Sequence, residues 1–195
     1  MREFTAEYLE VTREGMWDDS QRALAPLDSD ERECVLDVGA GTGELTRVLR
    51  EECPGTVVAL DADARLLSAV ADPRVRGDAI RLPFPDGAFD LVVCQALLVN
   101  LPDPEAAVRE FARVSGGAIA AIEPDNSAVR VDSTVEAEAH LARRARQLYL
   151  DGVETDASLG AARTLFEDSG LSDVTVSRYD HERTVESPYT ERAVE

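Results

Sequence analysis

The sequence predicts a doubly wound α/β domain whose sheet is mostly parallel. Apolar segments of strand length alternate with amphipathic helical segments between Cys34 and Ile122. The apolar segments are nearly continuous, as strands are when helices cover both faces of a parallel sheet. A glycine-rich turn joins the first apolar segment to the helix that follows it. No internal repeat or low-complexity linker divides the chain, so residues 1–195 are expected to form one domain.

The predicted elements follow one another in a regular order. N-terminal helices are expected over residues 2–26, where Pro26 stops the second one. We then expect five strands, over Cys34–Val38, Thr56–Leu60, Arg74–Arg76, Phe89–Cys94 and Ala118–Ile122. The helices between them are expected over Glu44–Glu52, Ala64–Val70 and Pro104–Val114.

The last third of the chain departs from this alternation. Ser133-Thr134-Val135-Glu136 is a capping box, and it predicts an inserted helix over residues 133–150. This helix is expected to lie over the carboxyl ends of strands four and five, the edge at which such sheets bind ligands, and to cover the site there. Its apolar positions Val135, Ala139, Ala142 and Leu148 are expected to face inward. A helix over 158–169 and an alternating strand over Val174–Tyr179 follow. No later segment could supply a seventh strand, so we expect a truncated chain or a six-stranded variant.

The chain is strongly acidic, with 39 acids, 20 bases that are all arginine, and a net charge of −19. This charge repels a phosphate backbone, which disfavours nucleic acid as a partner. An acid-rich chain without lysine also resembles proteins of salt-loving archaea, in which case the acidity reports habitat. No segment is long and apolar enough to span a bilayer, and the N-terminus lacks the apolar block of a signal peptide. A cytoplasmic protein is therefore expected.

The three cysteines, Cys34, Cys53 and Cys94, have no CxxC spacing, and two of them lie in predicted strands. Inert thiols are expected, and neither disulfides nor a metal site.

A glycine-rich turn between the first strand and its helix carries the main chemical signal. Its sequence is Asp37-Val38-Gly39-Ala40-Gly41-Thr42-Gly43-Glu44. Glycines let the backbone approach a ligand closely, and a helix N-terminus offers unpaired N–H groups. The dinucleotide-binding motif needs its third glycine where this chain has Glu44. Asp37 and Glu44 would repel a pyrophosphate and suit a ligand that carries a positive sulfonium.

This segment resembles the first motif of the class I S-adenosylmethionine (SAM)-dependent methyltransferases, which have a Rossmann-like fold. The likeness continues in register to about Pro124, through ALDADARLL, VRGDAIRLPFPDGAFDLVVCQALLVNLPDP and REFARVSGGAIAAIEPD. The sequence is similar to the small-molecule branch of the family, which includes quinone-biosynthesis methyltransferases. The resemblance implies SAM as cofactor, S-adenosylhomocysteine as product and a small-molecule acceptor.

The resemblance also implies which residues bind the cofactor. Asp61 would accept hydrogen bonds from both ribose hydroxyls, and Asp78 would accept one from the adenine amino group. Ala79 would offer its N–H to the ring, and Ile80 would pack on the base. The remaining predicted cofactor residues belong to the glycine turn, the ends of strands two and four, and the N-terminal segment: Asp37, Gly39, Ala40, Gly41, Gly43, Ala62, Cys94, Gln95 and Arg13.

Some of these residues have an alternative interpretation. Asp61 and Asp78 could each be a helix cap or a turn residue. Arg13 could pair with the SAM carboxylate while Trp17 covers the site, or the two could be a surface arginine and a packing tryptophan. Arg143, Arg144 and Arg146 could attract an anionic acceptor or pair with the acidic surface.

Methyl transfer is an in-line displacement, so the protein mainly has to align the acceptor, and a base is needed only for a protonated acceptor. His140, Asn100 and Asp125 are the candidates for catalysis, and each could equally be structural or solvated. The fourth strand is not followed by the Asn/Asp-Pro-Pro-aromatic run that marks methylation of exocyclic amines of bases. The acceptor and the oligomeric state do not follow from the sequence.

Two other functions are alternatives to a methyltransferase. A non-catalytic SAM-binding regulatory or scaffold protein stays open, because the chain shows no obvious base and no seventh strand. A dinucleotide-dependent oxidoreductase is disfavoured by the positions of Gly43 and Glu44.

Thermal stability should rise with salt up to molar concentrations. The reason is the net charge of −19, whose self-repulsion is relieved as the screening length falls to roughly 3 Å at 1 M. Melting temperatures between low and molar potassium chloride test this, and a flat or falling curve would restore the acidity as evidence about partners.

Overall fold

The computed structural model describes residues 5–7, 9, 17, 24–125, 128–151 and 159–180. Most of the predicted N-terminal helices and the predicted Arg13 contact lie outside these residues. Within the described part of the chain, no helix has the length and apolar content needed to cross a membrane.

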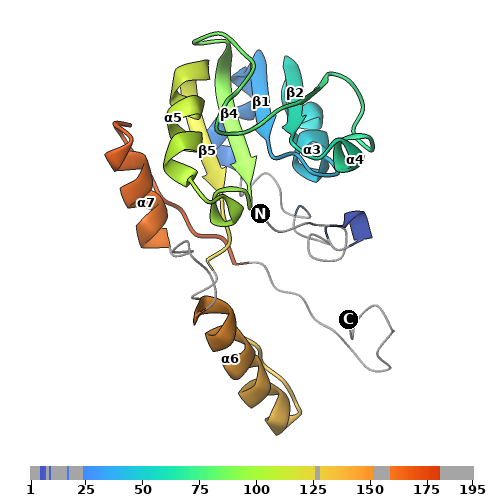
Figure 1. The fold of residues 1–195 in the computed structure, drawn as a ribbon, viewed down its shortest axis with the longest axis vertical. Coiled ribbons are helices and arrows are strands. Elements are labelled where there is room, and N and C mark those ends of the chain that lie inside the picture. Colours follow the sequence, from blue (N-terminus) through green and yellow to red (C-terminus); the bar gives the residue numbers. More distant parts are fainter. Residues whose placement is uncertain are drawn as a thin grey trace.

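Five parallel strands form one sheet at the centre of the molecule (Figure 1). Their order across the sheet is β3-β2-β1-β4-β5, so the chain starts in the middle and winds outward in both directions. The strands are β1 (Cys34–Val38), β2 (Thr56–Asp61), β3 (Arg74–Arg76), β4 (Phe89–Gln95) and β5 (Ser115–Ile122). The predicted doubly wound parallel sheet is confirmed.

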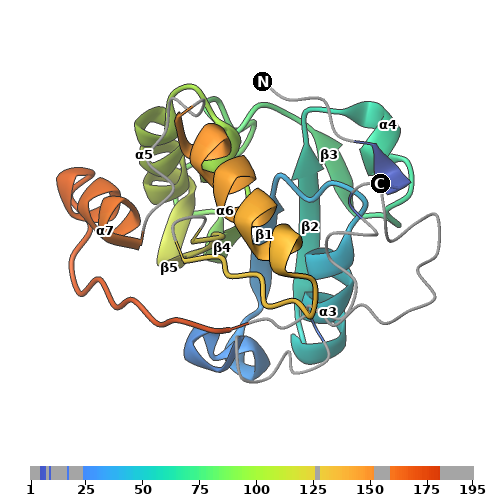
Figure 2. The ribbon, with the colours of Figure 1, turned by 90° about the horizontal axis from the view of Figure 1, so that it is seen from below.

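Helices lie on both faces of the sheet (Figures 1 and 2). On one face, α3 (Glu44–Glu52) buries Leu45, Val48 and Leu49 against Val35 of β1 and Val57 of β2. On the other face lie α5 (Pro104–Val114) and α7 (Leu159–Asp168). The remaining helices are α4 (Ala64–Leu67), α6 (Glu136–Asp151) and three 3-10 turns, η1 (Ala25–Leu27), η2 (Ser29–Glu31) and η3 (Leu98–Asn100).

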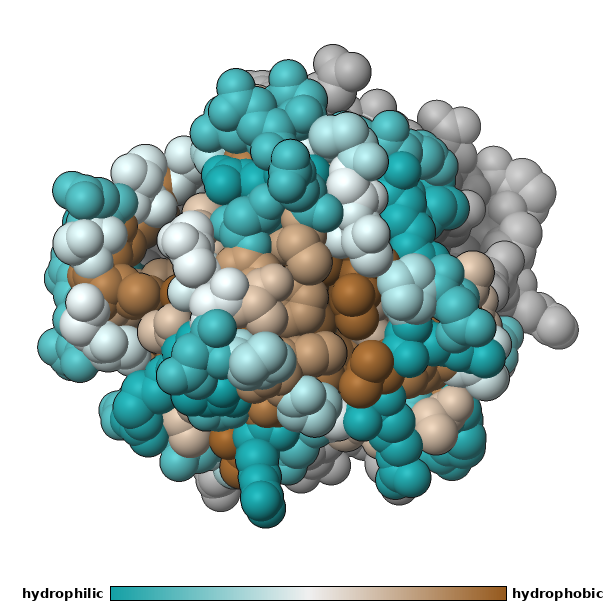
Figure 3. Space-filling view, turned by 90° about the horizontal axis from the view of Figure 1, so that it is seen from above, coloured by the Kyte–Doolittle hydropathy of each residue, from teal (hydrophilic) through white to brown (hydrophobic). Residues whose placement is uncertain are grey.

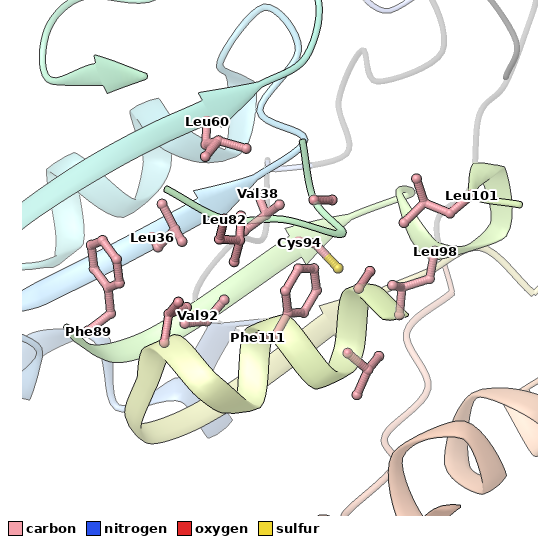
Figure 4. Packing of buried hydrophobic residues seen from close by; sticks show 14 residues of the cluster. Leu36, Val38, Leu60, Leu82, Phe89, Val92, Cys94, Leu98, Leu101 and Phe111 are labelled. Atoms are coloured by element: carbon pink, nitrogen blue, oxygen red, sulfur yellow. The ribbon is translucent and has the colours of Figure 1, made fainter. Parts of the chain in front are cut away.

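Phe111 is the largest fully buried side chain on the α5 face. Figure 4 shows its ring pointing from α5 into a cluster that includes Cys94 and Leu82. Leu82 belongs to the loop between β3 and β4, and α5 holds that loop through polar contacts. Glu110 Oε2 accepts the Leu82 N–H at 2.8 Å, and Arg113 donates to the Leu82 carbonyl at 3.0 Å. The loop therefore replaces a helix as cover for this part of the sheet.

Helices cover the α5 face only in part, within the residues that the structure describes. Val58 of β2, Val75 of β3 and Phe84 pack against the core cluster there but stay partly exposed. On the face seen from above, Figure 3 shows an apolar area surrounded by hydrophilic side chains.

Several boundaries differ from the sequence prediction. Strands β2 and β4 are each one residue longer than expected, and β5 begins at Ser115 and not at Ala118. The helix expected over Ala64–Val70 ends at Leu67, and the chain continues as a turn in which Val70 donates to the Leu67 carbonyl. The helix expected from Ser133 begins at Glu136, and the one expected over 158–169 is observed over Leu159–Asp168. Residue 158 itself lies outside the described residues.

The strand predicted over Val174–Tyr179 is wrong, because these residues form no strand. Val176 and Tyr179 are exposed there. An alternating sequence becomes a strand only where a neighbouring strand accepts its backbone hydrogen bonds. Among the described residues the sheet therefore has five strands rather than the expected six.

Candidate functional site

The parallel strands end at one edge of the sheet, and this edge brings together residues that are far apart in the sequence. Val38 at the end of β1 is in register with Leu60 of β2 and Cys94 of β4. Gln95 is in register with Ile122 of β5. The predicted glycine turn, Asp61 and Cys94 therefore follow adjacent strands at the carboxyl edge, where open α/β sheets bind their ligands.

The glycine turn after β1 needs its glycines. Gly39, Gly41 and Gly43 have φ of 74°, 58° and 90°, which side chains disfavour. The Leu60 carbonyl accepts both the Gly39 N–H at 2.8 Å and the Ala40 N–H at 3.0 Å. A Cβ at Gly43 would lie 2.9 Å from Val70 Cγ2, so a larger residue would be crowded as well as strained. The sequence motif thus forms a tight turn whose backbone is held from β2.

Asp61, the last residue of β2, contacts this turn directly. Its Oδ2 accepts the Gly41 N–H at 2.8 Å, and its Oδ1 accepts the Asp63 N–H at 2.8 Å. Each carboxylate oxygen has a second lone pair, so these bonds leave acceptor capacity for ligand hydroxyls. Asp63, and not Asp61, caps α4 by accepting the Arg65 N–H at 2.8 Å. Asp61 therefore does not cap α4, but it accepts the Asp63 N–H as a turn residue does. Its contact with ligand hydroxyls stays a prediction.

Asp37 is buried beneath the turn, with 1% of its surface exposed. Its Oδ2 accepts from the Thr46 hydroxyl at 2.6 Å, and Thr46 is itself fully buried in α3. This charge-assisted bond ties the end of β1 to the helix that follows the glycine turn.

Asp78 lies in a turn between β3 and β4. Its Oδ1 accepts the Ile80 N–H at 3.1 Å, and its carbonyl accepts the Arg81 N–H at 3.0 Å. Asp78 is therefore a turn residue, as one of the two interpretations held. Ala79 is buried, whereas Ile80 is 41% exposed although it is a large apolar side chain.

Glu123, directly after β5, is a residue of this edge that the sequence analysis missed. Its carboxylate accepts three backbone N–H groups from the turn after β4, those of Leu97, Leu98 and Val99. The signal that could have found it is an acid directly after the predicted strand Ala118–Ile122. The residue predicted from the same segment was Asp125, two residues later.

Cys94 lies among these carboxylates at the end of β4. Burial raises its pKa well above the usual thiol value, and the charges of Glu123 and Asp37 raise it further. Burial also raises the pKa of Glu123, although the three N–H groups and the Cys94 thiol act in the opposite direction. The Cys94 thiol is therefore neutral, as the sequence predicts for an inert cysteine.

The three candidates for catalysis do not form a cluster that the described contacts support. Asn100 donates from Nδ2 to the Ala96 carbonyl at 2.8 Å, which is a structural bond within the turn after β4. The Asp125 carbonyl accepts the Ala128 N–H at 3.0 Å, and Asp125 is partly buried. His140 is exposed on α6.

Helix α6 lies beyond the carboxyl edge, and in the view from below it passes in front of the sheet (Figure 2). Figure 1 shows it standing off from the body of the domain. Of the positions expected to face inward, Ala139 and Ala142 are partly buried, but Val135 and Leu148 are 50% and 56% exposed. The prediction for these two is wrong. Val135 precedes the helix, and Arg146 of α6 donates to the Val129 carbonyl in the segment before it.

The predicted capping box also differs from the structure. The Ser133 hydroxyl accepts the Val135 N–H at 3.0 Å and donates to Glu138, so it orders the residues before the helix. Trp17 packs against the buried cluster on the α3 face, which favours the packing interpretation of this residue. Arg13 lies outside the described residues, and its contact with a ligand carboxylate stays a prediction.

The described residues contain no group of three His, Cys, Asp or Glu side chains that could hold a metal ion. Cys34, Cys53 and Cys94 are all free thiols.

Comparison with known proteins identifies the fold. Residues 36–121 match the family described as methyltransferase domain. A SAM-dependent methyltransferase from Aquifex aeolicus aligns with a TM-score of 0.64 at 18% identity, over 86% of this chain and 89% of that one. The fold is that of the class I methyltransferases. A second structure, a complex between the Haloferax volcanii Trm112 methyltransferase activator and a putative methyltransferase, aligns with a TM-score of 0.60 at 21% identity, over 91% and 85% of the two chains.

Curated relatives carry a more specific name. The demethylmenaquinone methyltransferase of Mycolicibacterium vanbaalenii is 34% identical over 141 residues, which are 70% of this chain and 60% of that protein. The enzyme of the same name from Thermus thermophilus is 40% identical over 101 residues, 46% of each chain. This chain thus spans 60% and 46% of the length of these two relatives. Together the comparisons support SAM as the cofactor.

Thr46→Val should lower the free energy of unfolding by about 1.5–3 kcal/mol, because the buried Asp37 carboxylate loses a charge-assisted hydrogen bond. Thr46→Ser is the matched control, since it keeps the hydroxyl and removes only a methyl group, a loss of about 1 kcal/mol. Urea unfolding of both variants measures the difference. Equal destabilisation of the two would mean that packing, and not the hydroxyl, is what matters.

Proposed function

We propose that the chain is a SAM-dependent methyltransferase that transfers a methyl group to a small-molecule acceptor. The observation that carries the proposal is the link between Asp61 and the glycine turn, in which one carboxylate holds the Gly41 N–H at 2.8 Å. This bond puts a partly exposed acceptor of ligand hydroxyls directly beside a closely approachable backbone. The family match over residues 36–121 supports the same reading.

The cofactor roles of the edge residues belong to this proposal. Asp61 would accept the ribose hydroxyls, and the exposed Ile80 would pack on the adenine next to Asp78 and Ala79. SAM supplies an activated methyl group on a positively charged sulfur. The chain's own task is then to orient the acceptor along the line of that bond and to exclude water. The carboxylates of Asp37 and Glu123 would favour the positive charge of the ligand electrostatically.

The acceptor class comes from the relatives. Since several of them are named demethylmenaquinone methyltransferases, demethylmenaquinone is the first acceptor to test, and α6 would cover the acceptor at the carboxyl edge of the sheet. Because one structural neighbour is in complex with a methyltransferase activator, the assay should be run with and without such a protein.

The protein should bind SAM and S-adenosylhomocysteine, and should bind NAD far more weakly, because Glu44 and Asp37 flank the turn that would hold a pyrophosphate. Calorimetric titration with the three ligands tests this.

Asp61→Ala should weaken S-adenosylhomocysteine binding, since each lost charged hydrogen bond is worth about 1.5–3 kcal/mol. Asp78→Ala, the matched control on an exposed turn, should weaken it less. A preference for NAD over SAM would overturn the proposed function.

Replacing residues 133–151 by a short linker should leave S-adenosylhomocysteine affinity nearly unchanged and abolish methyl transfer, because α6 would contribute to acceptor alignment and not to the cofactor turn. Transfer of labelled methyl groups from SAM to demethylmenaquinone, compared with the intact chain, measures this. Retained turnover would show that α6 is not part of the acceptor site, whereas loss of cofactor binding would place it at the cofactor.

A further inference from the structure

The carboxylate of Glu123 organises a turn that belongs to another strand. Glu123 Oε1 accepts the N–H groups of Leu97 at 3.0 Å and Leu98 at 2.9 Å, and Oε2 accepts that of Val99 at 3.3 Å. These are the N–H groups of the N-cap residue Leu97 and of the first two residues of η3, which have no partner within the turn itself. A cap of this kind usually comes from the residue that precedes the helix. Here it comes from the end of β5.

Further bonds fix the same turn. Ala96 has a left-handed φ of 48°, and its N–H donates to the Ile122 carbonyl of β5 at 2.9 Å. Its carbonyl accepts from Asn100 Nδ2 at 2.8 Å. The backbone between Ala96 and Asn100 is therefore held by β5 and by its own asparagine, with Glu123 supplying the charge-assisted part.

The turn after β4 carries the Leu97 side chain, which packs against Gly39, the first glycine of the glycine turn. A Cβ at Gly39 would lie 2.8 Å from Leu97 Cδ1 and 3.1 Å from Cδ2. On its other side, the Gly39 N–H donates to the Leu60 carbonyl at 2.8 Å. Gly39 thus lies between the Leu60 carbonyl of β2 and the side chain of Leu97, whose backbone N–H donates to Glu123.

We propose that Glu123 is a positioning residue for the glycine turn, and that it acts through the Leu97 side chain on Gly39. Its carboxylate already accepts three N–H groups and contacts the Cys94 thiol at 3.7 Å, which commits it to holding the turn and not to proton transfer. The binding part of the test rests on the proposed function, and a second readout does not.

The variants are Glu123→Ala, Glu123→Gln, Leu97→Ala and the double variant Glu123→Ala/Leu97→Ala. Asp90→Ala is the matched control, because Asp90 also accepts backbone N–H groups, those of Glu33 and Cys34, but at the opposite edge of the sheet. Glu123→Ala should weaken S-adenosylhomocysteine binding about tenfold, which corresponds to about 1.4 kcal/mol. Glu123→Gln should restore most of the affinity, since one amide oxygen can still accept from Leu97 and Leu98.

The double variant should bind little worse than either single one, because both substitutions break the same chain of contacts. Asp90→Ala should lower the melting temperature while leaving the affinity nearly unchanged, because its bonds lie at the edge away from the glycine turn. If Glu123→Ala does not fold, Glu123→Asp keeps the charge but withdraws it from the turn, and should show the same loss of affinity.

Amide hydrogen exchange is the readout that needs no ligand. Glu123→Ala should speed exchange at Leu97–Val99 and at Gly39–Gly43, whereas Asp90→Ala should speed it at Glu33 and Cys34 only. Unchanged exchange at Gly39–Gly43, or additive effects of Glu123→Ala and Leu97→Ala, would overturn the positioning role. If the unaltered chain binds no S-adenosylhomocysteine, the proposed function fails, and the exchange data still decide the role of Glu123.

Discussion

The structure depends on how a parallel sheet satisfies backbone N–H groups where its strands meet loops. Such groups cost free energy when they are buried without an acceptor. In this chain, carboxylates at the strand ends accept them from neighbouring segments. Asp61 accepts from Gly41, and Glu123 accepts from the turn after β4. At the opposite edge, Asp90 of β4 accepts the N–H of Glu33 at 2.7 Å, just before β1.

This arrangement links the loops of the site to one another. The glycine turn is bonded to β2 through Asp61 and the Leu60 carbonyl, and it contacts Leu97 of the turn after β4. That second turn is in turn bonded to β5. A ligand that enters this edge meets backbone already held from three strands, so it loses little free energy in ordering the protein.

The sequence predicted what is local and failed where distant segments decide. The strand, glycine turn and helix around Gly39 follow from apolar periodicity and backbone freedom, which neighbouring residues set. Val174–Tyr179 alternates like a strand but has no partner strand in the described structure, and no pattern in one segment reveals that. Glu123 was missed for a related reason, since its three donors precede it by more than twenty residues. Val135 and Leu148 were expected to face inward because helical periodicity predicts an apolar face. The periodicity does not predict which other segment covers that face.

The acids of this edge differ physically from the acids that give the chain its net charge of −19. Surface charges are screened within roughly 3 Å at molar salt, so their mutual repulsion and their effect on partners fade there. Asp37 is 1% exposed, and both it and Glu123 act electrostatically on the buried Cys94 thiol. Buried charges are screened much less by salt. A preference of this edge for a sulfonium over a pyrophosphate would therefore persist at salt concentrations that screen the charges of the acidic surface. The ligand preference of the site is thus separate from the net charge of the molecule.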